Sequence, residues 1–243
     1  MRFLKHALIV LSLGLCAVVA SATPANPQSG VDYRLLAKPQ PTDSGKKVEV
    51  IEFFWYSCPH CNAFEPELEA WVKKQGDNIV FKRVPVAFRD SMVPEQKLYY
   101  ALEAMGKSEE MQKKIFRAIH VEHQQLNNDA AIADYIAKQG IDRQKFIDLY
   151  NSFAVQTKAR RVAQLQQAYE VDGVPLIVID GRFVTSPSIV AAGMGNAPEP
   201  ALMAGTLQVM DWLVVKSAKE TKAQEAKPAA AAKNAPAKAS TAK

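Results

Sequence analysis

Residues 46–61 read KKVEVIEFFWYSCPHC, and this stretch decides how the chain folds. Residues 48–56 are nearly continuous in apolar, β-branched and aromatic side chains, which is typical of a central strand buried on both faces. The strand runs directly into the motif CPHC, residues 58–61, and residues 62–74 then carry apolar side chains at helical spacing. The sequence therefore places two cysteines where a buried strand meets the start of a helix.

The rest of the chain predicts one mixed sheet that is interrupted by a block of helices. A further strand is predicted at residues 78–86, and two more, at 174–180 and 182–186, are joined by an Asp180-Gly181 turn. A last helix is predicted at residues 199–215. Helices between the strands are predicted, with N-caps at Asn128 and Asp142, over residues 94–105, 109–120, 128–138, 142–150 and 152–169. We therefore expect an α/β fold with an inserted α-helical domain.

The first 22 residues have the pattern of a secretory signal peptide. Arg2 and Lys5 precede an apolar run at residues 7–20, and Ala20-Ser21-Ala22 matches a cleavage site. An uncleaved anchor is the alternative, but the run is short for a membrane span. The leader therefore predicts export from the cytoplasm.

The C-terminal tail, residues 217–243, is rich in Ala, Lys and Pro and has almost no large apolar side chain. This composition predicts disorder. A solvated helix over residues 218–226 is the alternative, and Pro228 and Pro236 argue against a long one. Together with Lys216 the tail holds seven Lys and two Glu, which alone equals the net charge of +5 of the whole chain. The basic character thus belongs to the tail, and we expect no nucleic-acid partner.

The cysteines indicate redox chemistry. The chain has three, and Cys16 lies in the leader, so the exported protein would keep Cys58 and Cys61. A structural disulfide usually closes a long loop, whereas a bridge across two residues constrains the unfolded chain very little. Redox chemistry or metal binding therefore explains such a close pair better than a structural role does.

Each position of the motif has a physical reason in disulfide exchange. Cys58 falls at a helix N-terminus, where free N–H groups and the helix dipole favour a thiolate. Pro59 suits the first helical turn, and His60 can add a donor or a positive charge beside the thiolate. Cys61 lies one turn further in, ready to attack a mixed disulfide formed by Cys58. A stabilised thiolate favours the reduced form, so this disulfide is expected to be a strong oxidant.

Metal binding is the main alternative for this motif. Zinc would need two more ligands, and besides His60 the exported chain offers only His120 and His123, which we expect on the surface of the helical block. Haem attachment needs a histidine directly after the second cysteine, where Asn62 stands. A copper-holding chaperone would need a further soft ligand near the pair, and none is evident. We therefore expect no metal and no cofactor beyond the redox-active disulfide Cys58–Cys61.

The run VEVIEFFWYSCPHC, together with GVPLIVIDGRF at residues 173–183, resembles the DsbA family of bacterial periplasmic thiol:disulfide interchange proteins, part of the thioredoxin superfamily. The likeness covers about Tyr33 to Val215. It implies a thioredoxin-like mixed sheet with an inserted α-helical domain. The thioredoxin-like parts would be residues 23–90 and 162–216, and the inserted domain residues 91–161.

The resemblance also implies a function and its partners. The protein would be a periplasmic oxidase that donates its disulfide to unfolded or newly exported cysteine-containing proteins, and the membrane quinone reductase DsbB would reoxidise it. Pro175 would be a cis proline beside the disulfide, and Val174 would offer backbone hydrogen bonds to a substrate strand. An isomerase or reductase is the alternative, but periplasmic isomerases of this fold carry an N-terminal dimerisation domain. Only about 25 residues separate Ala22 from the first predicted strand, too few for a domain, so we expect a monomer.

Glu52 stands in an otherwise apolar strand, where a carboxylate is costly unless it is paired or protonated. It matches the family's buried acid beneath the second cysteine, which exchanges a proton with that thiol. The alternative is a glutamate that reaches a polar edge. The family also has a lysine near this acid. Our best register places Phe81 opposite Glu52 and turns Lys82 to the other face, which leaves a Lys82–Glu52 pair in doubt.

Overall fold

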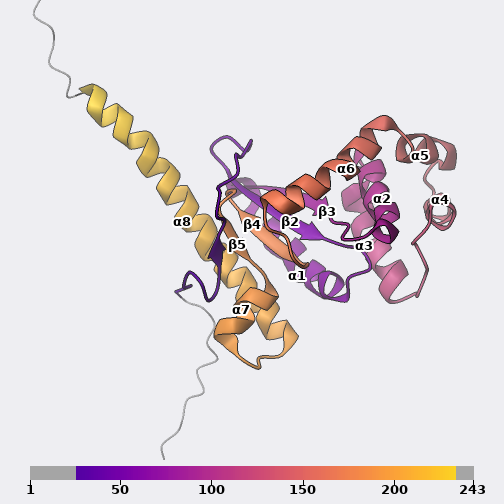
Figure 1. Cartoon of the computed structure of the whole chain (residues 1–243), viewed down its shortest axis with the longest axis horizontal. Helices are drawn as coiled ribbons and strands as arrows, with labels where there is room; N and C mark the ends of the chain where they lie inside the picture. Colours follow the sequence, from indigo (N-terminus) through magenta and orange to yellow (C-terminus); the bar gives the residue numbers. More distant parts are fainter. Residues whose placement is uncertain (1–25, 234–243) are drawn as a thin grey trace, which may run out of the picture.

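A mixed sheet of five strands, in the order β1-β5-β4-β2-β3, forms the centre of the structure (Figure 1). This computed structural model describes residues 26–233, so the predicted signal peptide, residues 1–22, lies outside the described residues. The central strand β2 pairs in parallel with β3 and antiparallel with β4, and β4, β5 and β1 continue antiparallel. The strands are β1 (Arg34–Leu35), β2 (Val48–Phe54), β3 (Ile79–Pro85), β4 (Leu176–Ile179) and β5 (Phe183–Thr185).

Helices cover both faces of the sheet and form a block at one end of it. The helices α1 (Pro59–Gln75) and α8 (Glu199–Lys233) pack on one face, and the C-terminal part of α6 (Phe153–Ala168) packs on the other. The block of α2 to α6 lies between β3 and β4 in the chain, on the right of Figure 1. The remaining elements are η1 (Gly76–Asn78), η2 (Asp90–Met92), α2 (Val93–Ala104), α3 (Ser108–His120), α4 (Asp129–Lys138), α5 (Arg143–Tyr150) and α7 (Pro187–Met194).

The strand β2 confirms the prediction from its apolar run, because all seven of its residues are buried. Val50 packs with residues of α1 and α8, whereas Ile51 and Phe53 pack on the opposite face. Phe54 continues into the core of the helical block, and that core also contains Cys58 and Cys61. The helical block therefore supports the cysteine motif directly.

The helical block has the predicted N-caps. The Asn128 side chain accepts a hydrogen bond from the backbone N–H of Ala131 at 3.0 Å, and Asp142 accepts one from Lys145 at 2.8 Å. Each cap satisfies a backbone donor that the first helical turn leaves free. Helix α6 runs unbroken to Ala168, so it crosses residue 161, where we place the end of the inserted domain. The boundaries of that domain stay a prediction.

The structure contradicts the expectation of disorder for residues 217–233, because α8 continues to Lys233. Packing anchors this extension: Ser217 is buried and hydrogen-bonded to Asp180, and Ala218 packs against the core. Glu220 accepts a hydrogen bond from Arg182 at 2.8 Å. Most of the residues that follow are Ala, Lys and Glu, strong helix formers that propagate a helix once it is anchored, and the helix continues past Pro228, contrary to our expectation. The last ten residues of the predicted tail lie outside the described part.

The predicted Asp180-Gly181 turn joins β4 and β5, and both residues have positive φ, 54° and 60°. The backbone N–H of Arg182 donates to the Ile179 carbonyl oxygen at 3.1 Å, so Asp180 and Gly181 are the central residues of a tight turn, where positive φ favours glycine. A side chain would also meet the backbone here, because a Cβ on Gly181 would lie 2.2 Å from the carbonyl oxygen of Gln40. The turn is therefore a docking point for the segment that precedes β2.

We expect Gly181→Ala to lower the free energy of unfolding by about 2–4 kcal/mol, because it adds a steric clash to the strain of positive φ. Gly45→Ala is the matched control. Gly45 also has positive φ, 64°, but nothing lies within 4 Å of the added Cβ, so strain of about 1 kcal/mol is the whole cost. Urea denaturation of both variants measures the difference, and equal losses would contradict the docking role.

Candidate active site

The CPHC motif lies where β2 ends and α1 begins. Cys58 is the N-cap of α1 and Pro59 is its first residue, as the sequence predicts. The backbone N–H of Cys58 donates to the carbonyl of Trp55 at 3.0 Å, which fixes the turn into the helix. Both cysteines are free thiols; Cys58 is 6% exposed, whereas Cys61 is 0% exposed. Only Cys58 therefore offers its sulfur to another protein.

The two thiols differ in acidity. The pKa of Cys58 is lowered to about 6, chiefly by a hydrogen bond from the Cys61 side chain. The backbone N–H groups of Cys61 and His60 lower it further, and the charge of His60 adds a smaller effect in the same direction. Burial and the neighbouring Cys58 raise the pKa of Cys61 well above its ordinary value. At neutral pH the pair therefore consists of a slightly accessible thiolate at Cys58 and a fully buried thiol at Cys61.

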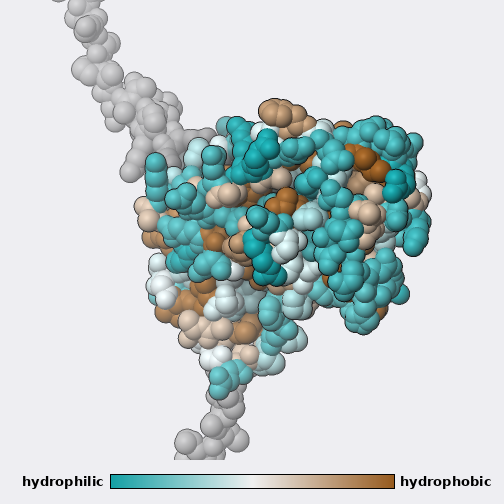
Figure 2. All heavy atoms as spheres, turned by 45° about the vertical axis from the view of Figure 1, so that its right-hand side comes forward, coloured by the Kyte–Doolittle hydropathy of each residue, from teal (hydrophilic) through white to brown (hydrophobic). Residues whose placement is uncertain are grey.

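The loop before β4 faces Cys58. The Val174–Pro175 peptide bond is cis, as the family resemblance implies, and the Val174 carbonyl oxygen lies 3.5 Å from the Cys58 Sγ atom. A cavity of about 300 Å³ adjoins this loop and is lined by His60, Val174 and Pro175 together with residues of α7 and α8. Hydrophobic residues gather on the lower lobe of the molecule in Figure 2, where α7 and the start of α8 lie. The arrangement offers an extended peptide a backbone acceptor and an apolar surface beside the thiolate.

Glu52 is fully buried in β2, so the alternative of a glutamate at a polar edge is wrong. The predicted register is also wrong, because Arg83 lies opposite Glu52 and Phe81 lies opposite Val50. The Arg83 Nε atom donates to Glu52 at 3.1 Å. Lys82 points to the other face, as expected, and bonds Glu49 at 2.6 Å. The basic partner of the buried acid is thus an arginine that our reading of the sequence missed.

Arg83 is shared by several acids beneath the motif. It donates to Glu65 of α1 and to Glu109 of α3, in each case at 2.9 Å. Burial raises the pKa of Glu52 despite the adjacent Arg83, and burial, followed by the charge of Glu52, raises that of Glu65 to about 8. Among the described residues the Glu52 Oε1 atom has no hydrogen-bond partner. The raised pKa of Glu65 favours the protonated form of its carboxyl at neutral pH. The charge of Glu52 also raises the pKa of Cys61.

The helical block supplies two further contacts that sequence analysis missed. Glu95 of α2 accepts hydrogen bonds from the backbone N–H and the hydroxyl of Ser57 at 3.0 and 2.7 Å. Burial raises the pKa of Glu95 to about 7. His120, expected on the surface, instead lies 2.7 Å from the Tyr56 carbonyl oxygen through its Nε2 atom. In the sequence, the signal for the first contact is that Glu95, an acidic residue, lies on the same helix face as Leu98 and Leu102.

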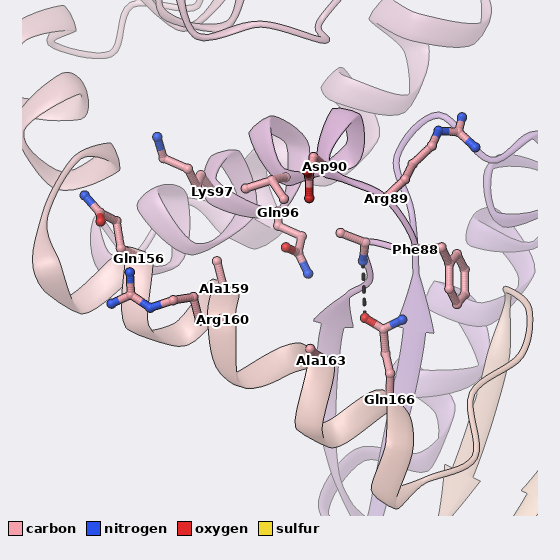
Figure 3. A pocket seen from close by; sticks show the side chains of 12 residues that line it. Phe88, Arg89, Asp90, Gln96, Lys97, Gln156, Ala159, Arg160, Ala163 and Gln166 are labelled. Atoms are coloured by element: carbon pink, nitrogen blue, oxygen red, sulfur yellow. Dashed lines mark hydrogen bonds between the residues drawn. The ribbon is translucent and has the colours of Figure 1, made fainter.

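A larger cavity, of about 600 Å³, lies between the start of α2 and α6 (Figure 3). Gln166 on its wall accepts a hydrogen bond from the backbone of Ala87 at 3.4 Å. None of the residues that line it is a cysteine or histidine, so it is separate from the redox motif. Within residues 26–233 no cluster of three or more His, Cys, Asp or Glu side chains is arranged to hold a metal. In the same residues no helix has both the length and the apolar composition of a membrane span.

Comparison with known proteins supplies the family. A model of the DSBA-like thioredoxin domain matches residues 83–203. A thiol:disulfide interchange protein DsbA of Burkholderia cepacia is 50% identical over 207 residues, which cover 85% of this chain and 93% of the relative. The chain belongs to the DsbA family. DsbA of Bordetella pertussis is 41% identical, with 87% of this chain and 96% of the relative covered.

Solved DsbA structures agree with this assignment. The crystal structure of Pseudomonas aeruginosa DsbA aligns with a TM-score of 0.72 at 33% identity and covers 81% of this chain and 97% of its own. As a member of the DsbA family, the protein is a thiol:disulfide oxidoreductase with a thioredoxin-like fold. DsbA proteins work through a redox-active disulfide without a cofactor, which makes Cys58 and Cys61 the candidate redox pair.

We expect the reduced protein to gain stability relative to the oxidised protein as pH rises from about 6 to about 8.5. The folded-state pKa of Cys58 is depressed below that of an unfolded thiol. Its contribution is therefore complete above the unfolded pKa and is lost as pH falls through the folded pKa. The disulfide form lacks this contribution. Urea denaturation of both forms across this pH range measures it, and a pH-independent difference would contradict the depressed pKa.

Proposed function

We propose that this protein is an oxidase that donates its Cys58–Cys61 disulfide to newly exported proteins during their oxidative folding. The observation that carries the proposal is the asymmetry of the two thiols, a depressed pKa at the accessible Cys58 and a raised pKa at the buried Cys61. A stabilised thiolate favours the reduced pair and makes the disulfide a stronger oxidant.

In the first step a substrate thiolate attacks the Cys58 sulfur. The Cys58–Cys61 bond breaks, a mixed disulfide forms at Cys58, and Cys61 leaves and takes up a proton. A second substrate thiolate then attacks the substrate sulfur of the mixed disulfide and releases Cys58 as a thiolate. Two electrons pass from the substrate to the enzyme. Of the two protons that the substrate thiols lose, one ends on Cys61 and the other goes to solvent.

Glu52 is our candidate for the proton exchange at Cys61. Support comes from its complete burial, its raised pKa and its unpartnered Oε1 atom, all beside the charge of Arg83. A protonated carboxyl can give a proton to the departing Cys61 thiolate, and the carboxylate can take it back when the disulfide reforms. Pro59 begins helix α1 and His60 favours the Cys58 thiolate, while Val174 and Pro175 would hold the substrate backbone beside it.

The proposed oxidase would act in the periplasm, on protein substrates and with a membrane partner. The leader at residues 1–22 supports export to the periplasm, and the substrates would be unfolded or newly exported proteins with cysteines. The DsbA family assignment supports reoxidation by the membrane quinone reductase DsbB, with this chain acting as a monomer.

The test is disulfide transfer to a reduced, unfolded model peptide with two cysteines. We expect one peptide disulfide to appear for each enzyme disulfide consumed, as measured by acid quench, thiol alkylation and mass spectrometry. Cys58→Ser is the control, and it should transfer none. Oxidised wild-type protein that leaves the peptide reduced would contradict an oxidase, and tight binding of a metal ion by the reduced protein would then favour a metal-holding role.

A further inference from the structure

The first residue of α8, Glu199, contacts the active-site histidine from across the cavity beside Cys58. The His60 Nδ1 atom lies 2.5 Å from the Glu199 Oε1 atom. Both side chains remain accessible, at 64% for His60 and 46% for Glu199. The two residues are far apart in the sequence, and the packing of α8 beside α1 brings them together.

The His60–Glu199 pair has uncharged neighbours in the lining of the cavity. Of the described residues that line the cavity, His60 and Glu199 are the charged ones; α7 contributes Pro187 and Ser188, and α8 also contributes Leu202. The other titratable group that acts on His60 is the Cys58 thiolate. Glu199 lies in the first turn of α8, where the positive end of the helix dipole favours an anion. The imidazole therefore contacts the Glu199 carboxylate and also interacts with the charge of the Cys58 thiolate.

We propose that Glu199 is a positioning residue for disulfide exchange, which holds His60 in its cationic form beside Cys58 and so strengthens the disulfide as an oxidant. The inference rests on the proposed function and adds a residue to it. Glu199 acts through His60, because its carboxylate contacts the imidazole, whose charge in turn lowers the pKa of Cys58.

The effect of Glu199 on the redox equilibrium of Cys58 and Cys61 has a definite direction and a modest size. The hydrogen bond that His60 donates to Glu199 is the largest cause that raises the pKa of His60, and the resulting charge is one of the smaller causes that lower the pKa of Cys58. Because both side chains are exposed, solvent and salt screen the pair. We therefore expect a shift of about twofold to fivefold in the redox equilibrium, larger at low salt.

The experiment compares Glu199→Gln in the wild-type and His60→Ala backgrounds. Glutamine keeps the shape and one acceptor but removes the charge. In the wild-type background we expect the pKa of Cys58, followed by thiolate absorbance, to rise, and the equilibrium with glutathione to move toward the disulfide by about twofold to fivefold. In the His60→Ala background only direct repulsion between Glu199 and the thiolate remains, so the same substitution should leave the pKa of Cys58 unchanged or lower it.

The surface pair of Glu103 and Lys158 gives a matched control, since its contact is also 2.5 Å and its side chains are similarly exposed. Glu103→Gln should change neither the pKa of Cys58 nor the equilibrium with glutathione. A fall in the pKa of Cys58 in the Glu199→Gln protein, or equal shifts in the two backgrounds, would overturn the proposal. These titrations need no substrate, so failure of the oxidase proposal in the peptide assay would be seen separately.

Discussion

Replacing Cys61 with alanine is expected to turn the protein into a covalent trap for its protein partners. Cys61→Ala removes the hydrogen bond that lowers the pKa of Cys58 most. Cys58 would still attack a partner disulfide, because its helix N-cap position and the backbone N–H groups of residues 60 and 61 remain. No second thiol could then resolve the mixed disulfide. We expect no detectable covalent complexes with the wild-type protein, whereas a large share of the Cys61→Ala protein should be in such complexes. Non-reducing gels after acid quench and alkylation would show them.

Two controls make the trapping result specific. Cys58→Ser should yield no covalent complexes, because Cys61 is buried and its pKa is raised. Reducing agent should release every complex of the Cys61→Ala protein. If complexes form equally well with Cys58→Ser, Cys58 is not the residue whose sulfur attacks the partner.

The second large effect is expected from Arg83→Met. Methionine has a similar length but no charge, so Glu52 and Glu65 would remain buried without their shared cation. Removal of one partner from a buried ion pair typically costs about 3–5 kcal/mol of stability. Since both carboxyls have raised pKa values, the loss should shrink as pH falls and they become protonated. Urea denaturation between pH 5 and pH 8 would show both results.

A surface arginine and a compensating variant control this experiment. Arg143 pairs with Asp134 at 2.9 Å, and both side chains are about half exposed, so Arg143→Met should cost less than about 1 kcal/mol. The triple variant Glu52→Gln, Glu65→Gln, Arg83→Met removes the guanidinium and both ionisable carboxyl groups, and it should recover much of the loss. If Arg83→Met costs no more than Arg143→Met, the buried network is not a major part of the stability.

Features set by local pattern could be predicted from the sequence. The buried strand β2, the helix that begins at Pro59, the N-caps at Asn128 and Asp142 and the Asp180-Gly181 turn each depend on neighbouring residues. The order of these elements, with helices between β3 and β4, could also be read from the chain, and the family resemblance added the cis bond at Pro175.

The missed features depend on how distant elements meet. Two charged residues follow one another at Lys82 and Arg83, so the strand pattern alone does not fix which of them faces Glu52. The contacts of Glu95 with Ser57 and of Glu199 with His60 likewise join different elements, whose packing no local pattern sets. The length of α8 was missed because composition does not reveal the anchoring of Ser217 and Glu220 by β4 and β5 neighbours.

We infer that the folded site stabilises the Cys58 thiolate and thereby makes the Cys58–Cys61 disulfide an oxidant. The most direct measurement is the equilibrium of this pair with reduced and oxidised glutathione at pH 7, followed by alkylation of the free thiols. We expect the pair to be more oxidising than glutathione, so that it is largely reduced even when oxidised glutathione is abundant. A pair that stays oxidised in an excess of reduced glutathione, as a structural disulfide does, would contradict an oxidising role for Cys58 and Cys61.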